Sequence, residues 1–143
     1  MQRYMPDWWV LPAISDKNRE FFTSGEIKIQ ACESCNTVQH PPEEVCHVCQ
    51  GITFDWRTCS GEGTIFSHTV VEHPIPNSLA DRVPYAVILV SLNDYPEIRI
   101  IGNAVNIDAE KVEVGQKVQA VFETIEDESA NITLKIPQWQ VVD

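Results

Sequence analysis

Apolar residues that either run together or alternate with polar ones fill the C-terminal part of the chain and predict β-strands. Five such segments occur, at residues 64–71, 85–92, 98–105, 117–125 and 132–136. The second is almost continuously apolar, as expected of a well-buried strand, whereas the last two alternate, so one face of each is expected to contact water. Prolines, glycines and short polar runs separate the segments. Five strands in such a short stretch predict a small barrel.

The N-terminal segment has a different pattern, in which aromatic and aliphatic residues are interrupted by prolines. The prolines keep the chain extended or irregular. A helix is then expected to begin at Ser15 or Asp16, residue types that cap helices, and to end at Gly25. The adjacent Trp8 and Trp9 either cover a neighbouring part of the same chain or bind another protein, because tryptophan is enriched at interface hot spots. We take both tryptophans as candidate partner-binding residues.

Four of the five cysteines form two C-x-x-C pairs separated by ten residues, Cys32 with Cys35 and Cys46 with Cys49. Each pair presents two sulfurs on one turn, and two such turns can surround zinc with a tetrahedron of thiolates. A site closed by four cysteines is structural, because no coordination position is left for water or substrate. An iron site of the rubredoxin kind uses the same ligands and stays an alternative. Redox-active dithiols would need a βαβ context that the pattern lacks.

These patterns predict a mainly β protein in three parts. An N-terminal segment with a short helix occupies residues 1–26, a rubredoxin-like zinc ribbon residues 27–56, and a five-stranded barrel residues 57–143. The natural candidate for that barrel is the OB fold, the oligonucleotide/oligosaccharide-binding barrel. The ribbon segment has little apolar core of its own, so we expect the metal to contribute on the order of 10 kcal/mol to its folding.

The charge of the chain argues against two classes of partner. Ten Lys and Arg residues stand against 21 Asp and Glu residues, which gives a net charge of −11. Nucleic acid and anionic membranes both require a basic surface, so neither is expected as a partner. The sequence has no apolar run long enough to span a bilayer and no secretory signal pattern. Cysteines arranged for a metal rather than for disulfides favour a reducing compartment, so a cytoplasmic protein is expected.

Few other residues are candidates for chemistry. Cys59 has no general base identifiable near it in the sequence and is expected to be a buried structural thiol. His68 and His73 are spaced five apart, so they cannot share one face of a strand. No glycine-rich phosphate loop is present. We therefore predict no catalytic residue, and a free-standing enzyme built on these three groups is the less favoured hypothesis.

The order of these parts resembles a zinc-ribbon/OB-fold family of acyl-CoA-associated proteins, formerly described as a domain of unknown function. The resemblance extends from about Asn18 to Val141. The matching stretches are residues 21–25, 29–35, 41–42, 46–49, 56, 60–65, 84–90, 101–103 and 114–118. The order and spacing of these stretches, rather than any single stretch, make the resemblance specific.

The resemblance implies a non-catalytic accessory subunit of an acyl-CoA-processing complex. The implied partner is a thiolase-like enzyme, an aldolase or an acyltransferase, and the implied pathways include steroid and lipid side-chain degradation. The subunit would support the fold and the CoA-ester site of its partner. Glu43 and Glu62 stand where the family often has basic residues, so acyl-CoA is expected to be held mainly by the partner. The alternative is a stand-alone OB-fold protein that binds single-stranded nucleic acid or acyl-CoA.

Overall fold

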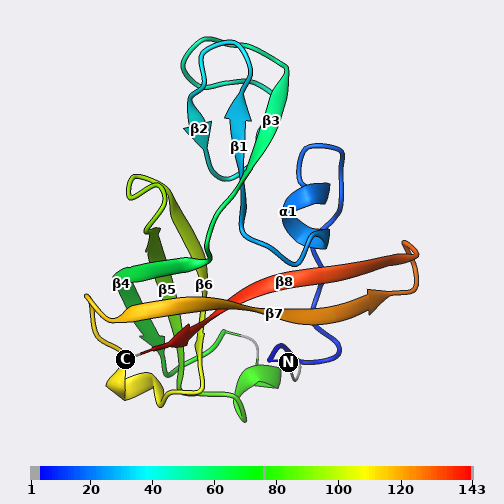
Figure 1. Cartoon of the computed structure of the whole chain (residues 1–143). Coiled ribbons are helices and arrows are strands. Elements are labelled where there is room, and N and C mark those ends of the chain that lie inside the picture. Colours follow the sequence, from blue (N-terminus) through cyan, green and yellow to red (C-terminus); the bar gives the residue numbers. More distant parts are fainter. Residues whose placement is uncertain (1–3, 76, 143) are drawn as a thin grey trace. The chain divides into compact units, whose positions relative to one another are not determined.

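The computed structural model describes residues 4–75 and 77–142, and Figure 1 labels its elements. The helical elements are α1 (Arg19–Thr23) and the 3-10 turns η1 (Asn77–Leu79) and η2 (Ala109–Lys111). The strands are β1 (Lys28–Cys32), β2 (Val38–Gln39), β3 (Phe54–Thr58), β4 (Glu62–Val71), β5 (Tyr85–Leu92), β6 (Arg99–Val105), β7 (Lys117–Asp127) and β8 (Ile132–Val141). No described helix is long and apolar enough to cross a membrane.

Contacts divide the chain into two compact units, which are described separately. One unit holds the residues up to Gly61 together with Val121–Pro137. The other holds Glu62–Ala120 together with the residues from Gln138 onward. The predicted part boundaries at residues 26 and 56 remain predictions.

The closed barrel has the strand order β4-β5-β6-β8-β7. Strands β4, β5 and β6 belong to the second unit, together with the first residues of β7 and the last residues of β8, whereas the rest of β7 and β8 belongs to the first unit. β5 pairs antiparallel with β4 and with β6, and the barrel closes where β4 meets β7 and where β6 runs parallel to β8. The predicted mainly β fold with a five-stranded OB-like barrel is therefore confirmed. Its interior is apolar, and its largest fully buried side chains include Ile65, Ile88, Val90, Leu92, Ile100 and Trp139.

The parallel contact between β6 and β8 depends on a glycine. A Cβ atom at Gly102 would lie 2.7 Å from Cδ1 and 2.9 Å from Nε1 of Trp139, whose side chain is fully buried. Only a residue without a side chain lets the indole ring approach this strand so closely. The prediction ended the last strand at residue 136, before Pro137, but β8 continues to Val141. The buried Gln138 helps to hold this extension of β8 beside β6, because its Oε1 accepts the Asn103 N–H at 2.7 Å.

The first unit contains a three-stranded antiparallel sheet in the order β2-β1-β3, together with α1. The helix begins at Arg19, later than the predicted Ser15 or Asp16. The cause is Asn18, whose side-chain oxygen accepts the Ser15 N–H at 2.8 Å while its amide donates to the Ala13 carbonyl at 3.0 Å. These bonds hold the preceding residues in a turn. The predicted stop is correct, because Gly25 has a φ of 73°.

Candidate functional site

The two C-x-x-C turns repeat one backbone geometry. The Cys32 N–H donates to the Thr37 carbonyl and the Cys46 N–H donates to the Gly51 carbonyl, at 2.9 and 2.8 Å. In each turn the fourth residue after the first cysteine, Asn36 or Gln50, has a φ of 61°. This left-handed residue bends the chain back, so that both cysteines of a turn face the same point.

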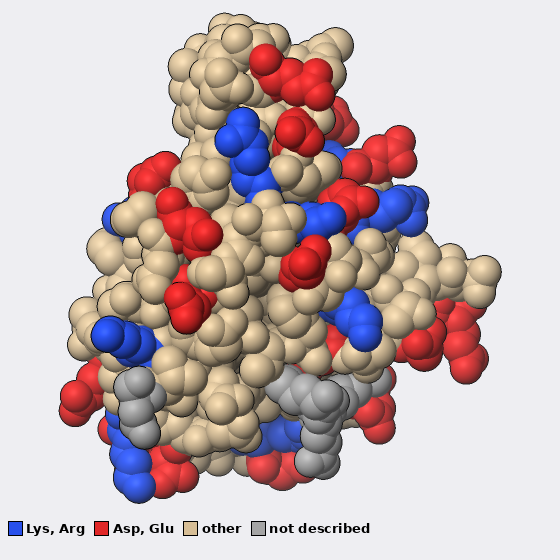
Figure 2. Space-filling view, viewed as in Figure 1, with Lys and Arg blue, Asp and Glu red and all other residues tan. Residues whose placement is uncertain are grey.

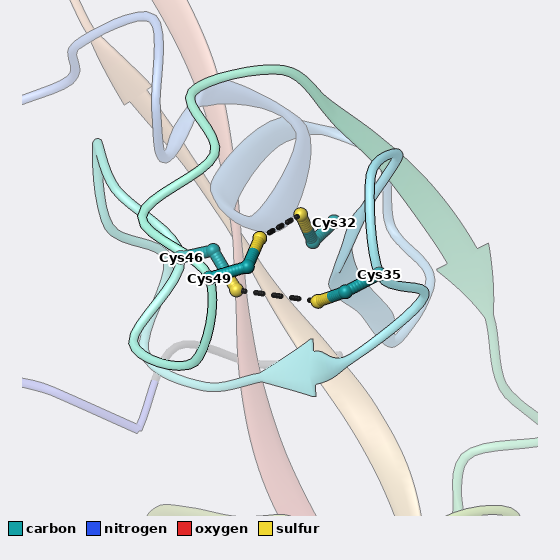
Figure 3. Close-up of side chains that lie close together, drawn as sticks. All are labelled: Cys32, Cys35, Cys46 and Cys49. Atoms are coloured by element: carbon teal, nitrogen blue, oxygen red, sulfur yellow. Dashed lines mark hydrogen bonds between the residues drawn. The ribbon is translucent and has the colours of Figure 1, made fainter.

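The four sulfur atoms meet in one cluster, and Figure 3 shows the side chains pointing toward one another. The sulfurs of Cys32 and Cys49 are 3.5 Å apart, those of Cys35 and Cys46 are 3.7 Å apart, and all four lie within 4.8 Å of one another. A disulfide requires about 2.05 Å, so these are free thiols. Tetrahedral zinc with Zn–S bonds of about 2.3 Å separates its sulfurs by about 3.8 Å. The donor set and its spacing therefore fit a structural zinc ion.

The thiols of this cluster differ in acidity. Hydrogen bonds from the Thr37 hydroxyl and from its backbone N–H favour the thiolate and lower the pKa of Cys35 to about 6. Cys49 accepts a backbone hydrogen bond from Gly51 that lowers its pKa, but the neighbouring thiols, Cys32 first, outweigh it and raise the pKa to about 12. Because zinc binds thiolates, metal binding must displace protons from the cluster, and the affinity will fall at low pH.

A buried glutamine network supports the second turn. The Gln39 Oε1 atom accepts the His47 N–H at 3.1 Å and lies 2.7 Å from His47 Nδ1. The Gln39 Nε2 atom donates to Gln30 Oε1 at 2.7 Å and to the Val45 carbonyl at 3.3 Å. These partners fix which amide atom is the oxygen, so Nδ1 of His47 must carry its hydrogen. The imidazole is therefore bonded to Gln39 and takes no place in the cysteine cluster.

Gln30 extends this network to the connection between the two cysteine turns. Its Nε2 donates to the Glu43 carbonyl at 2.7 Å, and its Oε1 accepts the Glu43 N–H at 3.0 Å. Both Gln30 and Gln39 are buried. Sequence reasoning missed them because glutamine usually lies at the surface. The one available signal was their position on or beside short strands that flank the cysteine pairs.

The histidines of the ribbon segment differ in environment. His47 is exposed. His40 is half-buried, its ring packs on Phe21 with the centroids 4.9 Å apart, and burial lowers its pKa to about 4. This contact forms because the chain after β2 returns to α1. His40 is neutral in the folded protein at physiological pH.

The other candidate residues are not part of the metal cluster. Cys59 is buried and its thiol points to the Arg57 carbonyl at 3.8 Å, as predicted for a structural thiol. His68 and His73 are exposed. Among the described residues, the four cysteines form the group suited to a metal.

Trp8 and Trp9 lie at the surface of the first unit. Their side chains are 56% and 37% exposed, and the two rings meet edge to face with centroids 5.3 Å apart. The adjacent Val10 is also exposed. The three residues form a small apolar surface, defined here as the tryptophan turn. Its role in binding a partner remains a prediction.

Comparisons with known proteins agree with this architecture. Residues 19–54 match the family model described as "ChsH2, rubredoxin-like zinc ribbon domain", and residues 56–123 match "ChsH2, C-terminal OB-fold domain". A "DUF35 domain-containing scaffold protein" of Methanocaldococcus jannaschii is 33% identical over 98 residues, which are 68% of this chain and 67% of that protein. The chain belongs to the DUF35 family. The metal expected for a member with these four cysteines is structural zinc, and the rubredoxin-like ribbon is the part that holds it.

Other similar proteins carry names from acyl-CoA metabolism. A "Probable enoyl-CoA hydratase alpha subunit" of Thermomonospora curvata is 37% identical over 112 residues, 75% of this DUF35 chain and 33% of that protein. A "3-oxo-4,17-pregnadiene-20-carboxyl-CoA hydratase alpha subunit" of Mycobacterium tuberculosis is 28% identical, and the match covers 37% of that protein. The chain thus spans about a third of the length of these two relatives.

The solved structures extend the likeness to nearly the whole chain. A chain of the structure titled "Ltp2-ChsH2(DUF35) aldolase" superposes with a TM-score of 0.70 and 30% identity, over 92% of this chain and 98% of that one. A DUF35-family protein of unknown function from Sulfolobus solfataricus superposes with a TM-score of 0.55 at 15% identity, which bears on the fold alone.

Proposed function

We propose that this DUF35 chain is a non-catalytic accessory subunit of an acyl-CoA-processing complex. The observation that carries the proposal is the end-to-end likeness to a chain of the Ltp2-ChsH2(DUF35) aldolase, whose name joins Ltp2 to a DUF35 protein. The names of the two hydratase alpha subunits support the same setting. The partner would be a thiolase-like enzyme, an aldolase or an acyltransferase, and steroid or lipid side-chain degradation is the favoured pathway class.

The residues of the chain support a division of labour in which the partner performs the chemistry. Four thiolates complete a tetrahedral zinc shell, so the metal centre has no position at which to activate water or substrate. The role of this centre is to hold the first unit in one conformation. Cys59 is buried, and His68 and His73 are exposed. The chain would support the fold of the partner and help to enclose its CoA-ester site.

Charge favours a partner that holds most of the acyl-CoA. Glu43 and Glu62 are exposed and acidic, and would repel rather than bind the phosphates of CoA. On the face shown in Figure 2, Lys and Arg are interspersed with Asp and Glu and form no continuous basic stripe. The same pattern disfavours the alternative of a nucleic-acid binder. The reduced cysteines favour a complex in the cytoplasm.

The tryptophan turn is the proposed contact with the partner. Exposed tryptophan is costly to leave in water, and large aromatic side chains contribute much of the binding energy at protein interfaces. The two rings support each other edge to face, so they offer one rigid apolar surface. This fits an apolar pocket on the enzyme subunit.

Affinity purification of the tagged chain from its native cells, followed by mass spectrometry, tests the proposal. We expect an acyl-CoA enzyme in near-stoichiometric amount, and at least a tenfold lower recovery of it with the Trp8→Ala/Trp9→Ala variant. Ile52→Ala is the control, because Ile52 is a 76% exposed apolar residue of the same unit outside the turn. Recovery of the chain alone would contradict the subunit proposal. Full recovery of the enzyme with the double variant would contradict only the role of the turn.

A further inference from the structure

Glu123 is a buried acid with no part in the metal centre. It lies on β7, and its side chain is fully buried, with 0% exposed. Its Oε1 atom accepts two backbone hydrogen bonds, from the Tyr4 N–H at 2.6 Å and from the Met5 N–H at 3.1 Å. All three residues belong to the same compact unit. A buried polar atom without a hydrogen-bond partner is costly, so these two backbone donors satisfy an acceptor that the fold removes from water.

These two bonds lie immediately before the tryptophan turn. Pro6 follows Met5 and is buried. The Pro6 carbonyl accepts the Trp9 N–H at 3.0 Å. This bond closes a β-turn over residues 6–9, which includes the first two residues of the tryptophan turn. The backbone that enters the tryptophan turn is therefore held by the buried Pro6 ring and by the Glu123 side chain, whereas Trp8, Trp9 and Val10 are exposed.

We infer that Glu123 is a positioning residue for partner binding, a clamp that holds the backbone of Tyr4 and Met5 so that the tryptophan turn is presented in one conformation. The inference rests on the proposed function of the turn. A segment ordered before association loses less conformational freedom on binding, so the clamp would increase affinity without touching the partner. The occupant that fits is an apolar pocket of the acyl-CoA enzyme subunit. The net charge of −11 favours a basic rim around that pocket.

Amide hydrogen exchange on the isolated chain tests the clamp without any partner. Glu123→Leu removes the acceptor at nearly constant volume, whereas Glu123→Gln keeps one oxygen that can accept both N–H groups. We expect Glu123→Leu to accelerate exchange about tenfold or more at Tyr4, Met5 and Trp9, with amides of β1 and β5 unchanged. Glu123→Gln should retain most of the protection. Glu126→Leu is the control, because Glu126 is exposed on the same strand.

Two outcomes would overturn the inference. Unchanged exchange at Tyr4 and Met5 in Glu123→Leu would show that the Glu123 side chain does not hold them. Faster exchange there without an effect at Trp9 would show that the clamp does not order the turn. If Glu123→Leu does not fold, Glu123→Gln decides. The change from a carboxyl to an amide oxygen should shift the Tyr4 and Met5 amide proton resonances while those of β1 and β5 stay in place, and unchanged resonances at Tyr4 and Met5 would contradict the clamp.

Enzyme recovery from native cells then separates the clamp from the proposed function. Glu123→Leu should lower recovery as the Trp8→Ala/Trp9→Ala variant does, and the triple variant should show no further loss, because both changes act on one contact. An additive loss would contradict the positioning role. If the tryptophan variant has no effect on recovery, the role proposed for the turn is wrong, while the exchange data still decide whether Glu123 orders it.

Discussion

The zinc ribbon and the barrel are stabilised by different means within one chain. The barrel buries a continuous apolar interior that includes Ile88, Val90 and Trp139. The ribbon places four cysteines and two glutamines where a larger domain would have aliphatic side chains. A segment of some thirty residues cannot bury enough apolar surface to fold alone, so metal bonds and buried hydrogen bonds replace it. The metal ligands of the ribbon and the apolar core residues of the barrel therefore have the same structural role.

Cys46→Ser should produce the largest difference between the two regions. Loss of one thiolate removes metal binding on the order of 10 kcal/mol, so the β1–β3 sheet should unfold while β4, β5 and β6 stay folded. Heteronuclear NMR checks this, since the ribbon amides should collapse to disordered shifts and the barrel amides should keep their dispersion. Cys59→Ser is the matched control, because Cys59 is buried outside the cluster and its loss should leave zinc bound. Dispersed ribbon resonances in the absence of metal would show that the ribbon folds without it, and would contradict the difference between the ribbon and the barrel.

Gly102→Ala should destabilise the barrel and leave the ribbon intact. The added Cβ would press on the Trp139 ring, which is fully buried and cannot move away. Such overpacking costs about 1–3 kcal/mol. Chemical denaturation followed by barrel resonances measures the loss, while the absorption of the cobalt-substituted ribbon should be unchanged. Ile101→Ala, at the neighbouring exposed position, should change stability by less than about 0.5 kcal/mol. An equal effect of the two variants would show that the close approach is relaxed in solution.

The sequence predicted the parts whose signal is local. Two C-x-x-C pairs identify four ligands by spacing alone, and alternating apolar residues located the strands to within a few residues. The failures involve contacts between distant positions. The contact of His40 with Phe21 was not predicted because the two residues lie far apart in sequence. The last strand was ended before Pro137 because its pairing with β6 leaves no mark in either segment. The burial of Glu123 and Gln39 was not predicted for the same reason. Their partners are backbone groups and, for Gln39, the side chains of Gln30 and His47, and composition reveals none of these contacts.

Gln39→Leu should have the smallest effect. It tests whether buried hydrogen bonds stabilise the ribbon in addition to the metal. The variant leaves the apolar interior of the barrel untouched but removes the acceptor that holds the His47 N–H and ring, and the donor to Gln30 and Val45. Groups that orient metal ligands contribute about tenfold or more to metal affinity. We therefore expect zinc transfer to a colorimetric chelator to be about tenfold faster, with an unchanged denaturation midpoint for the barrel.

Gln39→Glu separates the two halves of this network, because its carboxylate keeps the acceptor for His47 and loses the donor to Gln30. If the His47 bonds hold the second cysteine turn, Gln39→Glu should release zinc at nearly the native rate, and the His47 ring should keep the Nδ1–H tautomer in its nitrogen chemical shifts. If the Gln30 bond dominates, both variants should lose zinc equally fast. Native release rates in both would show that the ribbon depends on its metal alone, and that the buried glutamines only fill the space that apolar residues fill in the barrel.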